Sequence, residues 1–167
     1  LAWATLVIPA GQMADIYGKR RLLLWGVSIF ALASILCGIV TSAPLLIFAR
    51  VLQGFGGALF VPPLYALVFK CFPERKRGFA IGMLGVGSAI GLAIGPSFGG
   101  YILANFGWPW IFLINGPLCL ITIAMIMSCV AKEPKRISEG KVDMQGGLLL
   151  GLSLMGFMYA LNQSEVW

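Results

Sequence analysis

The sequence predicts an all-α polytopic membrane protein, and three observations support this fold class: the composition, the long apolar runs and the charges between them. Hydrophobic residues make up 59% of the 167 positions and charged residues only 11%. Soluble domains carry about 25% charged residues. A water-soluble chain of this length could not bury so much apolar surface, so we expect the protein to be embedded in a membrane.

The apolar runs predict about six transmembrane helices. They cover residues 1–14, 22–40, 44–70, 78–104, 110–130 and 144–162. Runs of about 20 residues without an alternating pattern indicate helices rather than barrel strands. The first run reaches a charge at Asp15 and is too short for a complete span. We therefore expect the chain to begin inside a helix and to be part of a longer protein.

The charges between the apolar runs alternate along the chain. Lys and Arg gather in the connections near 15–21, 71–77 and 131–143, and none occurs near 41–43 and 105–109. The positive-inside rule places the basic connections in the cytoplasm. Trp108 and Trp110 then lie at the membrane–water interface on the outer side of the membrane, and tryptophan is enriched at such interfaces. The expected location is the cytoplasmic (inner or plasma) membrane, crossed several times.

The net charge of +6 does not indicate a nucleic-acid-binding protein. The cations separate apolar runs and do not form a continuous face, so they are typical of loop charges. The chain has four cysteines but no CxxC pair and no histidine, which argues against a zinc site. We expect no metal, no cofactor and no nucleic-acid partner.

Arg50 is the only charge well inside a predicted span, where an arginine costs about 2.5–3.5 kcal/mol on insertion scales. The small or polar residues Gln53, Gly54 and Gly57 follow on the same helix face. No Asp or Glu lies inside a complete span, so the partner of Arg50 lies outside this sequence, or Arg50 faces a wet cavity. Arg50 either ties helices together or borders a transport pathway.

The segment GQMADIYGKRR at residues 11–21 joins the first two predicted spans. It leaves room only for a tight turn, and Gly18 suits a left-handed backbone conformation. Asp15 lies among Lys19, Arg20 and Arg21. Its carboxylate balances these charges or caps a helix.

The stretch GLAIGPSFGG at residues 91–100 is unusually rich in glycine for a membrane span. Glycines recur every fourth residue, at Gly87, Gly91, Gly95 and Gly99. This spacing predicts a strip where a neighbouring helix approaches closely. Pro96 cannot donate to the carbonyl of Leu92 and predicts a bend. The strip is either a static packing motif or part of a helix that must both pack and bend.

Several segments resemble motifs of one known family. GQMADIYGKRR is similar to the loop motif G-x-L-A-D-R-x-G-R-K, with Met13 for Leu and Ile16 for Arg. LIFARVLQGFGGA is similar to the R-x-x-Q-G pattern of a fourth helix, and GLAIGPSFGG to the G-x-x-x-G-P-x-x-G-G motif of a fifth helix. WPWIFLINGP resembles W-R-W-x-F-x-I-N-x-P with Pro109 for Arg, and VDMQG resembles V-D-W-x-G with Met144 for Trp. Together they resemble the major facilitator superfamily, and within it the fourteen-helix drug:proton antiporters of the EmrB/QacA type.

The resemblance implies a partial major facilitator superfamily fold. Residues 1–130 would be an N-terminal helical bundle containing family helices two to six, with the first of them truncated. Residues 131–143 would form a cytoplasmic loop, and residues 144–167 would begin the central helices with family helix seven.

The resemblance also implies roles for three groups of residues. The conformational gating loop would comprise Gly11, Asp15, Gly18, Lys19 and Arg20. Proton coupling and the transport pathway would involve Arg50, Gln53 and Gly54. The antiporter helix motif would comprise Gly91, Gly95, Pro96, Gly99 and Gly100. Family members often carry a carboxylate in the first helix, and such a residue outside this sequence would be the partner of Arg50.

The implied function is proton-coupled export of drugs or other lipophilic compounds by alternating access, without enzymatic activity. The expected partners are a small lipophilic substrate, protons and the lipid bilayer. Whether a periplasmic adaptor protein also binds is left open by the sequence. The alternative is a superfamily uptake carrier or facilitator of a small solute, against which the glycine-proline motif argues. A membrane-embedded enzyme is more remote, because the sequence has no histidine, no carboxylate inside a complete span and no paired nucleophile.

Overall fold

The computed structural model describes residues 2–131 and, further along the chain, residues 146, 149, 151–154, 156–157 and 160. The order of elements is α1 (Ala2–Tyr17), α2 (Lys19–Ile39), α3 (Ala43–Cys71), α4 (Glu74–Phe106), α5 (Trp108–Leu113) and α6 (Asn115–Cys129). The predicted connection 131–143 and the predicted span 144–162 lie largely outside the described residues.

Four stretches of the described chain are long and apolar enough to cross a membrane. They are α2, α3, α4 and the Trp108–Cys129 stretch formed by α5 and α6. These stretches confirm the second to fifth predicted spans. The largest difference in their bounds is at α4, where Glu74–Arg77 form the first helical turn and not a loop. The carboxylate of Glu74 is favoured there because it faces the positive end of the helix dipole.

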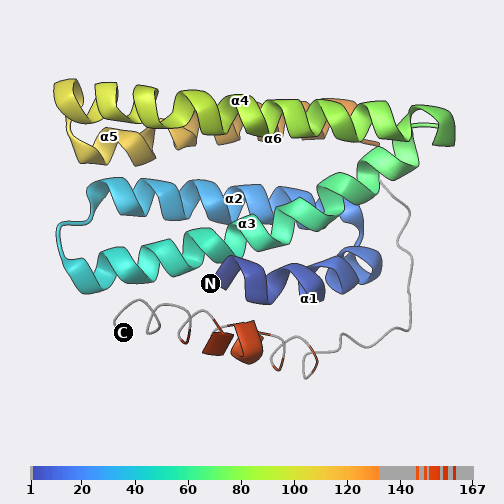
Figure 1. Cartoon of the computed structure of the whole chain (residues 1–167), viewed down its shortest axis with the longest axis horizontal. Coiled ribbons are helices and arrows are strands. Elements are labelled where there is room, and N and C mark those ends of the chain that lie inside the picture. Colours follow the sequence, from blue (N-terminus) through green and yellow to red (C-terminus); the bar gives the residue numbers. More distant parts are fainter. Residues whose placement is uncertain are drawn as a thin grey trace.

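The helices run back and forth along the long axis of the molecule (Figure 1). The α1–α2 and α3–α4 connections and the end of α6 lie at one end, whereas the α2–α3 and α4–α5 connections lie at the other (Figure 1). The basic connections among the described residues therefore share one end of the bundle, as the charge alternation predicts.

α2 is the most buried of the four spanning stretches and forms the centre of the bundle. Its residues Leu23, Val27 and Ala31 form an apolar cluster with Leu67 of α3 and Ile126 of α6. α2 therefore joins α3 and α6 in one apolar cluster.

α2 and α3 cross very closely at two glycines. A Cβ on Gly26 would lie 2.7 Å from the backbone nitrogen of Phe60, and a Cβ on Gly56 would lie 2.6 Å from the backbone nitrogen of Phe30. Both distances are far below van der Waals contact, and the atoms met are backbone atoms. Only glycine at both positions allows this crossing. Beside it, the rings of Phe30 and Phe60 pack edge to face with centroids 5.8 Å apart.

α4 contacts only α3 and α5 among the described helices. A Cβ on Gly91, Gly95 or Gly99 would meet no atom within 4 Å. The close helix contact that the glycine strip predicts is therefore not made within the described part of the chain, and it stays a prediction for the rest of the protein. α4 continues as one helix past Pro96, and the functional bend also stays a prediction.

The connection between α1 and α2 is a single residue, Gly18. The sequence predicts a connecting turn over residues 11–21, whereas α1 extends to Tyr17 and α2 begins at Lys19. Gly18 has φ 94°, ψ 132°, so the expected positive φ is confirmed. Its amide donates to the carbonyl of Ala14 at 3.2 Å, and its carbonyl accepts from the amide of Leu22 at 3.1 Å. The sharp reversal is possible because glycine has no Cβ to clash at this φ.

The glycine crossing predicts an asymmetry between two glycine substitutions. In the full-length protein we expect Gly56→Ala to lower the melting temperature, because overpacking of about 1–3 kcal/mol exceeds the gain of about 1 kcal/mol in helix propensity. Gly116→Ala is the matched control. Its Cβ would meet Ile35 side-chain atoms at 3.7 and 3.8 Å, which is ordinary contact. We expect this variant to be neutral or stabilising. Equal melting temperatures for the two variants, measured in detergent, would refute the close crossing.

Candidate functional site

The small and polar face of α3 lines an open cavity beside the glycine crossing. The cavity has a volume of about 440 Å³ and is lined by Phe30, Arg50, Gln53, Gly54, Gly57 and Phe60. All four α3 residues expected on one helix face are therefore brought together. Ligand pockets in proteins typically measure about 300–1,000 Å³, so the cavity is large enough for part of a drug-sized molecule.

A chain of hydrogen bonds connects this cavity to α2. Nη1 of Arg50 donates to Oε1 of Gln53 at 3.1 Å, and Nε2 of Gln53 donates to Oγ of Ser34 at 2.8 Å. Ser34 is fully buried and Gln53 is 8% exposed. Polar side chains inside a membrane protein bond across helices because lipid offers them no partner. Gln53 therefore joins α2 to α3 and positions Arg50 at the same time.

A ring from α5 provides the second partner of Arg50. The guanidinium carbon lies 4.3 Å from the ring centroid of Phe112, within the range of a cation–π interaction. Among the described residues no carboxylate forms an ion pair with Arg50; both of its partners are neutral. The positive charge is thus held in place at the cavity without being neutralised.

Four of the five predicted gating residues, Asp15, Gly18, Lys19 and Arg20, lie at the α1–α2 junction, at one end of the bundle (Figure 1). Asp15 and Lys19 form an ion pair with an N···O distance of 3.9 Å, and 71% of the Asp15 side chain is exposed. Such exposed pairs contribute little to stability. The predicted charge balance at Asp15 is therefore present but weak. Gly11 faces α3, where an added Cβ would lie 3.9 Å from Cβ of Pro62.

Arg20 connects the gating segment to the last described helix. Its Nη2 donates to the carbonyl of Met127 at 3.0 Å. Met127 belongs to the last turn of α6, where carbonyls lack helical partners and a cation is favoured by the helix dipole. Nε of Arg20 is buried and has no hydrogen-bond partner among the described residues. A residue expected in a gating loop thus also stabilises the end of α6.

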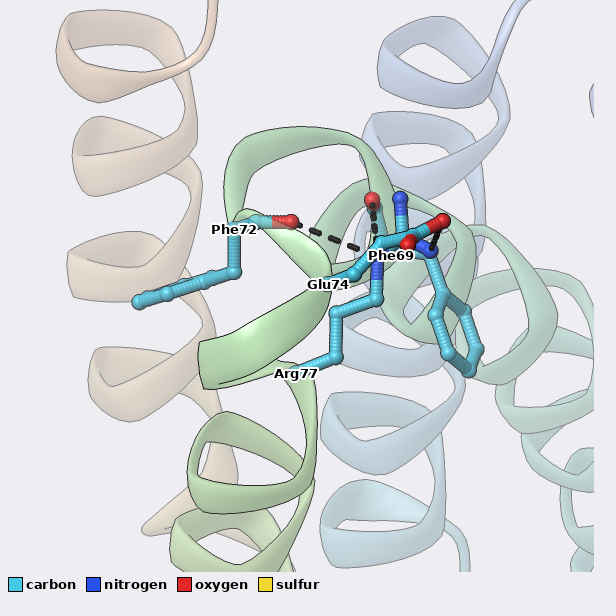
Figure 2. A network of polar contacts seen from close by, with 4 residues as sticks. All are labelled: Phe69, Phe72, Glu74 and Arg77. Atoms are coloured by element: carbon cyan, nitrogen blue, oxygen red, sulfur yellow. Dashed lines mark hydrogen bonds and ion pairs between the residues drawn. The ribbon is translucent and has the colours of Figure 1, made fainter.

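Arg77 closes the corner between α3 and α4, as Figure 2 shows. Its Nε donates to the carbonyls of Phe69 and Phe72 at 3.1 and 3.3 Å, and its Nη1 lies 3.4 Å from Oε1 of Glu74. Two carbonyls at the end of α3 are therefore satisfied by one side chain. The charge pattern of the sequence predicts only a loop charge at Arg77, although an Arg just beyond a helix end is also a capping signal.

The three groups of predicted residues therefore lie in three separate places. Arg50, Gln53 and Gly54 share the cavity, the gating residues lie around Gly18, and the glycine-proline motif lies on the exposed α4. Sequence reasoning missed Ser34 and Phe112. A serine inside an apolar run was a usable signal, because buried hydroxyls need partners. Nothing in the sequence pairs Phe112 with Arg50.

Four stretches that are long and apolar enough to cross a membrane, with a charged side chain beside an open cavity, define a multi-pass membrane protein. The sequence profile of the Major Facilitator Superfamily matches residues 1–164. The chain belongs to this superfamily.

Curated relatives of this chain include proteins named for drug resistance. It is 34% identical to the Multidrug resistance protein B homolog of Mycobacterium tuberculosis over 98% of the chain and 30% of that protein. It is 34% identical to the Probable multidrug resistance protein EmrY of Escherichia coli over 96% of the chain and 31% of that protein. It is 37% identical to the Methylenomycin A resistance protein of Streptomyces coelicolor over 96% of the chain and 34% of that protein. The chain thus spans about a third of the length of these relatives.

The hydrogen-bond chain predicts coupling between Ser34 and Gln53. Gln53→Leu should lower the melting temperature of the full-length protein, because it leaves the buried Ser34 hydroxyl without this partner, at a cost of about 1–3 kcal/mol. Adding Ser34→Ala to Gln53→Leu removes the unpaired hydroxyl. We therefore expect Ser34→Ala to cost less in the Gln53→Leu background than in the wild type. Additive melting shifts would show that the two side chains do not interact.

Proposed function

We propose that the complete protein exports drugs or other lipophilic compounds in exchange for protons, by alternating access. The observation that carries the proposal is Arg50, a charge inside a membrane span that borders an open cavity and has neutral partners among the described residues. The drug-resistance names of several relatives support the substrate class.

Arg50 can couple a proton to transport through its fixed charge. A guanidinium stays protonated in proteins. It therefore lowers the pKa of a carboxylate that approaches it, and that pKa rises again when the two groups separate. A carboxylate from a part of the protein outside this chain would release its proton near Arg50 and bind one away from it. The edge-to-face rings of Phe30 and Phe60 give the same cavity an apolar wall for a lipophilic substrate.

The other two groups serve the conformational change in this proposal. Gly11, Asp15, Gly18, Lys19 and Arg20 gate the movement from the end of the bundle. The α4 motif of Gly91, Gly95, Pro96, Gly99 and Gly100 lies on an exposed helix, where it would meet the part of the protein that moves against this bundle. A small-residue face allows that contact to be close.

The proposal places the protein in the cytoplasmic membrane with its basic end in the cytoplasm. In this proposal residues 1–130 would form the N-terminal bundle, 131–143 a cytoplasmic loop and 144–167 the start of the central helices. The protein moves its substrate without changing it chemically, and its partners are the substrate, protons and lipid.

Arg50 is the residue on which the transport test depends. The full-length protein in everted membrane vesicles should accumulate ethidium, a lipophilic cation, when the interior is acidic, and a protonophore should abolish this accumulation. Arg50→Ala should lower the rate of ethidium accumulation at least about tenfold, because raising the activation free energy by only about 1.4 kcal/mol slows a step tenfold. Arg50→Lys should recover only part of the transport rate, since the lysine ammonium lacks the planar fork of the guanidinium.

The control for this test is Lys76→Gln, which removes an exposed cation far from the cavity and should transport normally. Normal accumulation by Arg50→Ala would contradict the coupling role. Ethidium movement in the opposite direction, driven by the same gradient, would favour the uptake alternative.

The orientation is tested by labelling introduced cysteines in a cysteine-free full-length background. Cysteines at Ser42 and at Lys76 lie at opposite ends of the bundle and are both exposed. In intact cells an impermeant maleimide should label the Ser42 position, and the Lys76 position should react only after permeabilisation. Labelling of both positions from outside would rule out the proposed topology.

A further inference from the structure

The ring of Phe112 is held rigidly beneath the charge of Arg50. Phe112 is 8% exposed and packs with Cys37 and Ala49, which are 0% and 1% exposed. The ring of Trp108 meets it edge to face, with centroids 6.1 Å apart and an interplanar angle of 73°. The ring therefore has little freedom to move, whereas the guanidinium above it is exposed toward the cavity.

The backbone that carries this ring is also fixed. α5 lies against α2 so closely that a Cβ on Gly38 would come 2.7 Å from Cγ of Leu113 and 3.1 Å from the carbonyl oxygen of Pro109. These two residues flank Phe112 in the same short helix. The position of the ring is thus determined by α2, the same helix that supplies Ser34 to the hydrogen-bond chain.

We infer that Phe112 is a positioning residue for Arg50, which it holds at the cavity wall through the face of its ring. This inference rests on the proposed coupling role of Arg50. A ring face attracts a cation without neutralising it, because the attraction comes from the ring quadrupole. Arg50 therefore keeps its full charge for an incoming anionic group and is released from the ring by a modest competing interaction.

The strength of this restraint suits a reversible partner. A cation–π contact at an exposed site changes a population by about two- to fivefold. An ion pair inside the membrane would hold the guanidinium more tightly and would cancel its charge. Phe112 and Gln53 together thus define a resting position from which Arg50 can move. Losing the ring face would leave Gln53 as the single described partner of Arg50.

The experiment replaces Phe112 in the full-length protein with phenylalanine carrying one, two or three ring fluorines. Each fluorine withdraws electron density from the ring face with little change in shape, so the protein should fold. The first readout is the melting temperature in detergent, in the wild type and in Arg50→Gln. We expect the melting temperature to fall stepwise with fluorine number in the wild type and to stay flat in Arg50→Gln.

Phe106 provides the matched control position. Its ring contacts Trp110 at a centroid distance of 6.2 Å, and no described cation lies over it. The same fluorine series at Phe106 should give equal shifts in both backgrounds. Equal slopes in both backgrounds at Phe112 would overturn the cation–π contact.

The second readout is proton-driven ethidium accumulation in everted vesicles. We expect the rate to fall about two- to fivefold from zero to three fluorines at Phe112, in step with the melting temperature. An unchanged rate together with a falling melting temperature would overturn the positioning role. If the wild type shows no proton-driven transport while the melting series depends on Arg50, the proposed function and the positioning role both fail and the Phe112–Arg50 contact stands.

Discussion

The close crossing of α2 and α3 at Gly26 and Gly56 is the contact on which the other features depend. The hydrophobic effect gives little drive for association between helices in lipid, so close packing and interhelical hydrogen bonds hold them together. The crossing provides the close packing, and it permits an interhelical hydrogen bond because it brings Nε2 of Gln53 within 2.8 Å of Oγ of Ser34. A side chain at either glycine would push the backbones apart and stretch that bond. Gln53 would then no longer be held in the position from which it binds Arg50.

A charge inside a membrane has to be solvated by protein or water, and Arg50 shows how this chain does so. An amide oxygen and a ring face replace part of the water that a guanidinium would otherwise bind. Neither partner carries an opposite charge, so the cavity beside Arg50 keeps a positive potential. An ion pair would hold the side chain in place but would neutralise its charge. The amide and the ring hold it in place and leave the charge intact.

The helices could be predicted from the sequence because each depends on its own apolar run, whereas contacts between helices depend on how each is rotated about its axis. The run around Arg50 predicted both a span and the shared face of Gln53, Gly54 and Gly57. The glycine strip of α4 has the clearest spacing for close packing, yet among the described residues the close contacts occur at Gly26, Gly56 and Gly38, where the spacing is less regular. Phe112 could not be paired with Arg50, since that pairing needs the arrangement of three helices.

The single residue between α1 and α2 has a consequence for how this sequence can change. Each helical residue advances the chain by about 100° around its axis. Both helices hydrogen-bond to Gly18 itself, so no loop exists to absorb an extra residue. An insertion just after Gly18 would turn α1 and α2 relative to each other by more than a quarter of a revolution, so α1 could not keep its present contacts with both α2 and α3. The junction therefore sets the rotation of α1 relative to the central helix, and a change of length at this point would cost the contacts of α1 with the rest of the bundle.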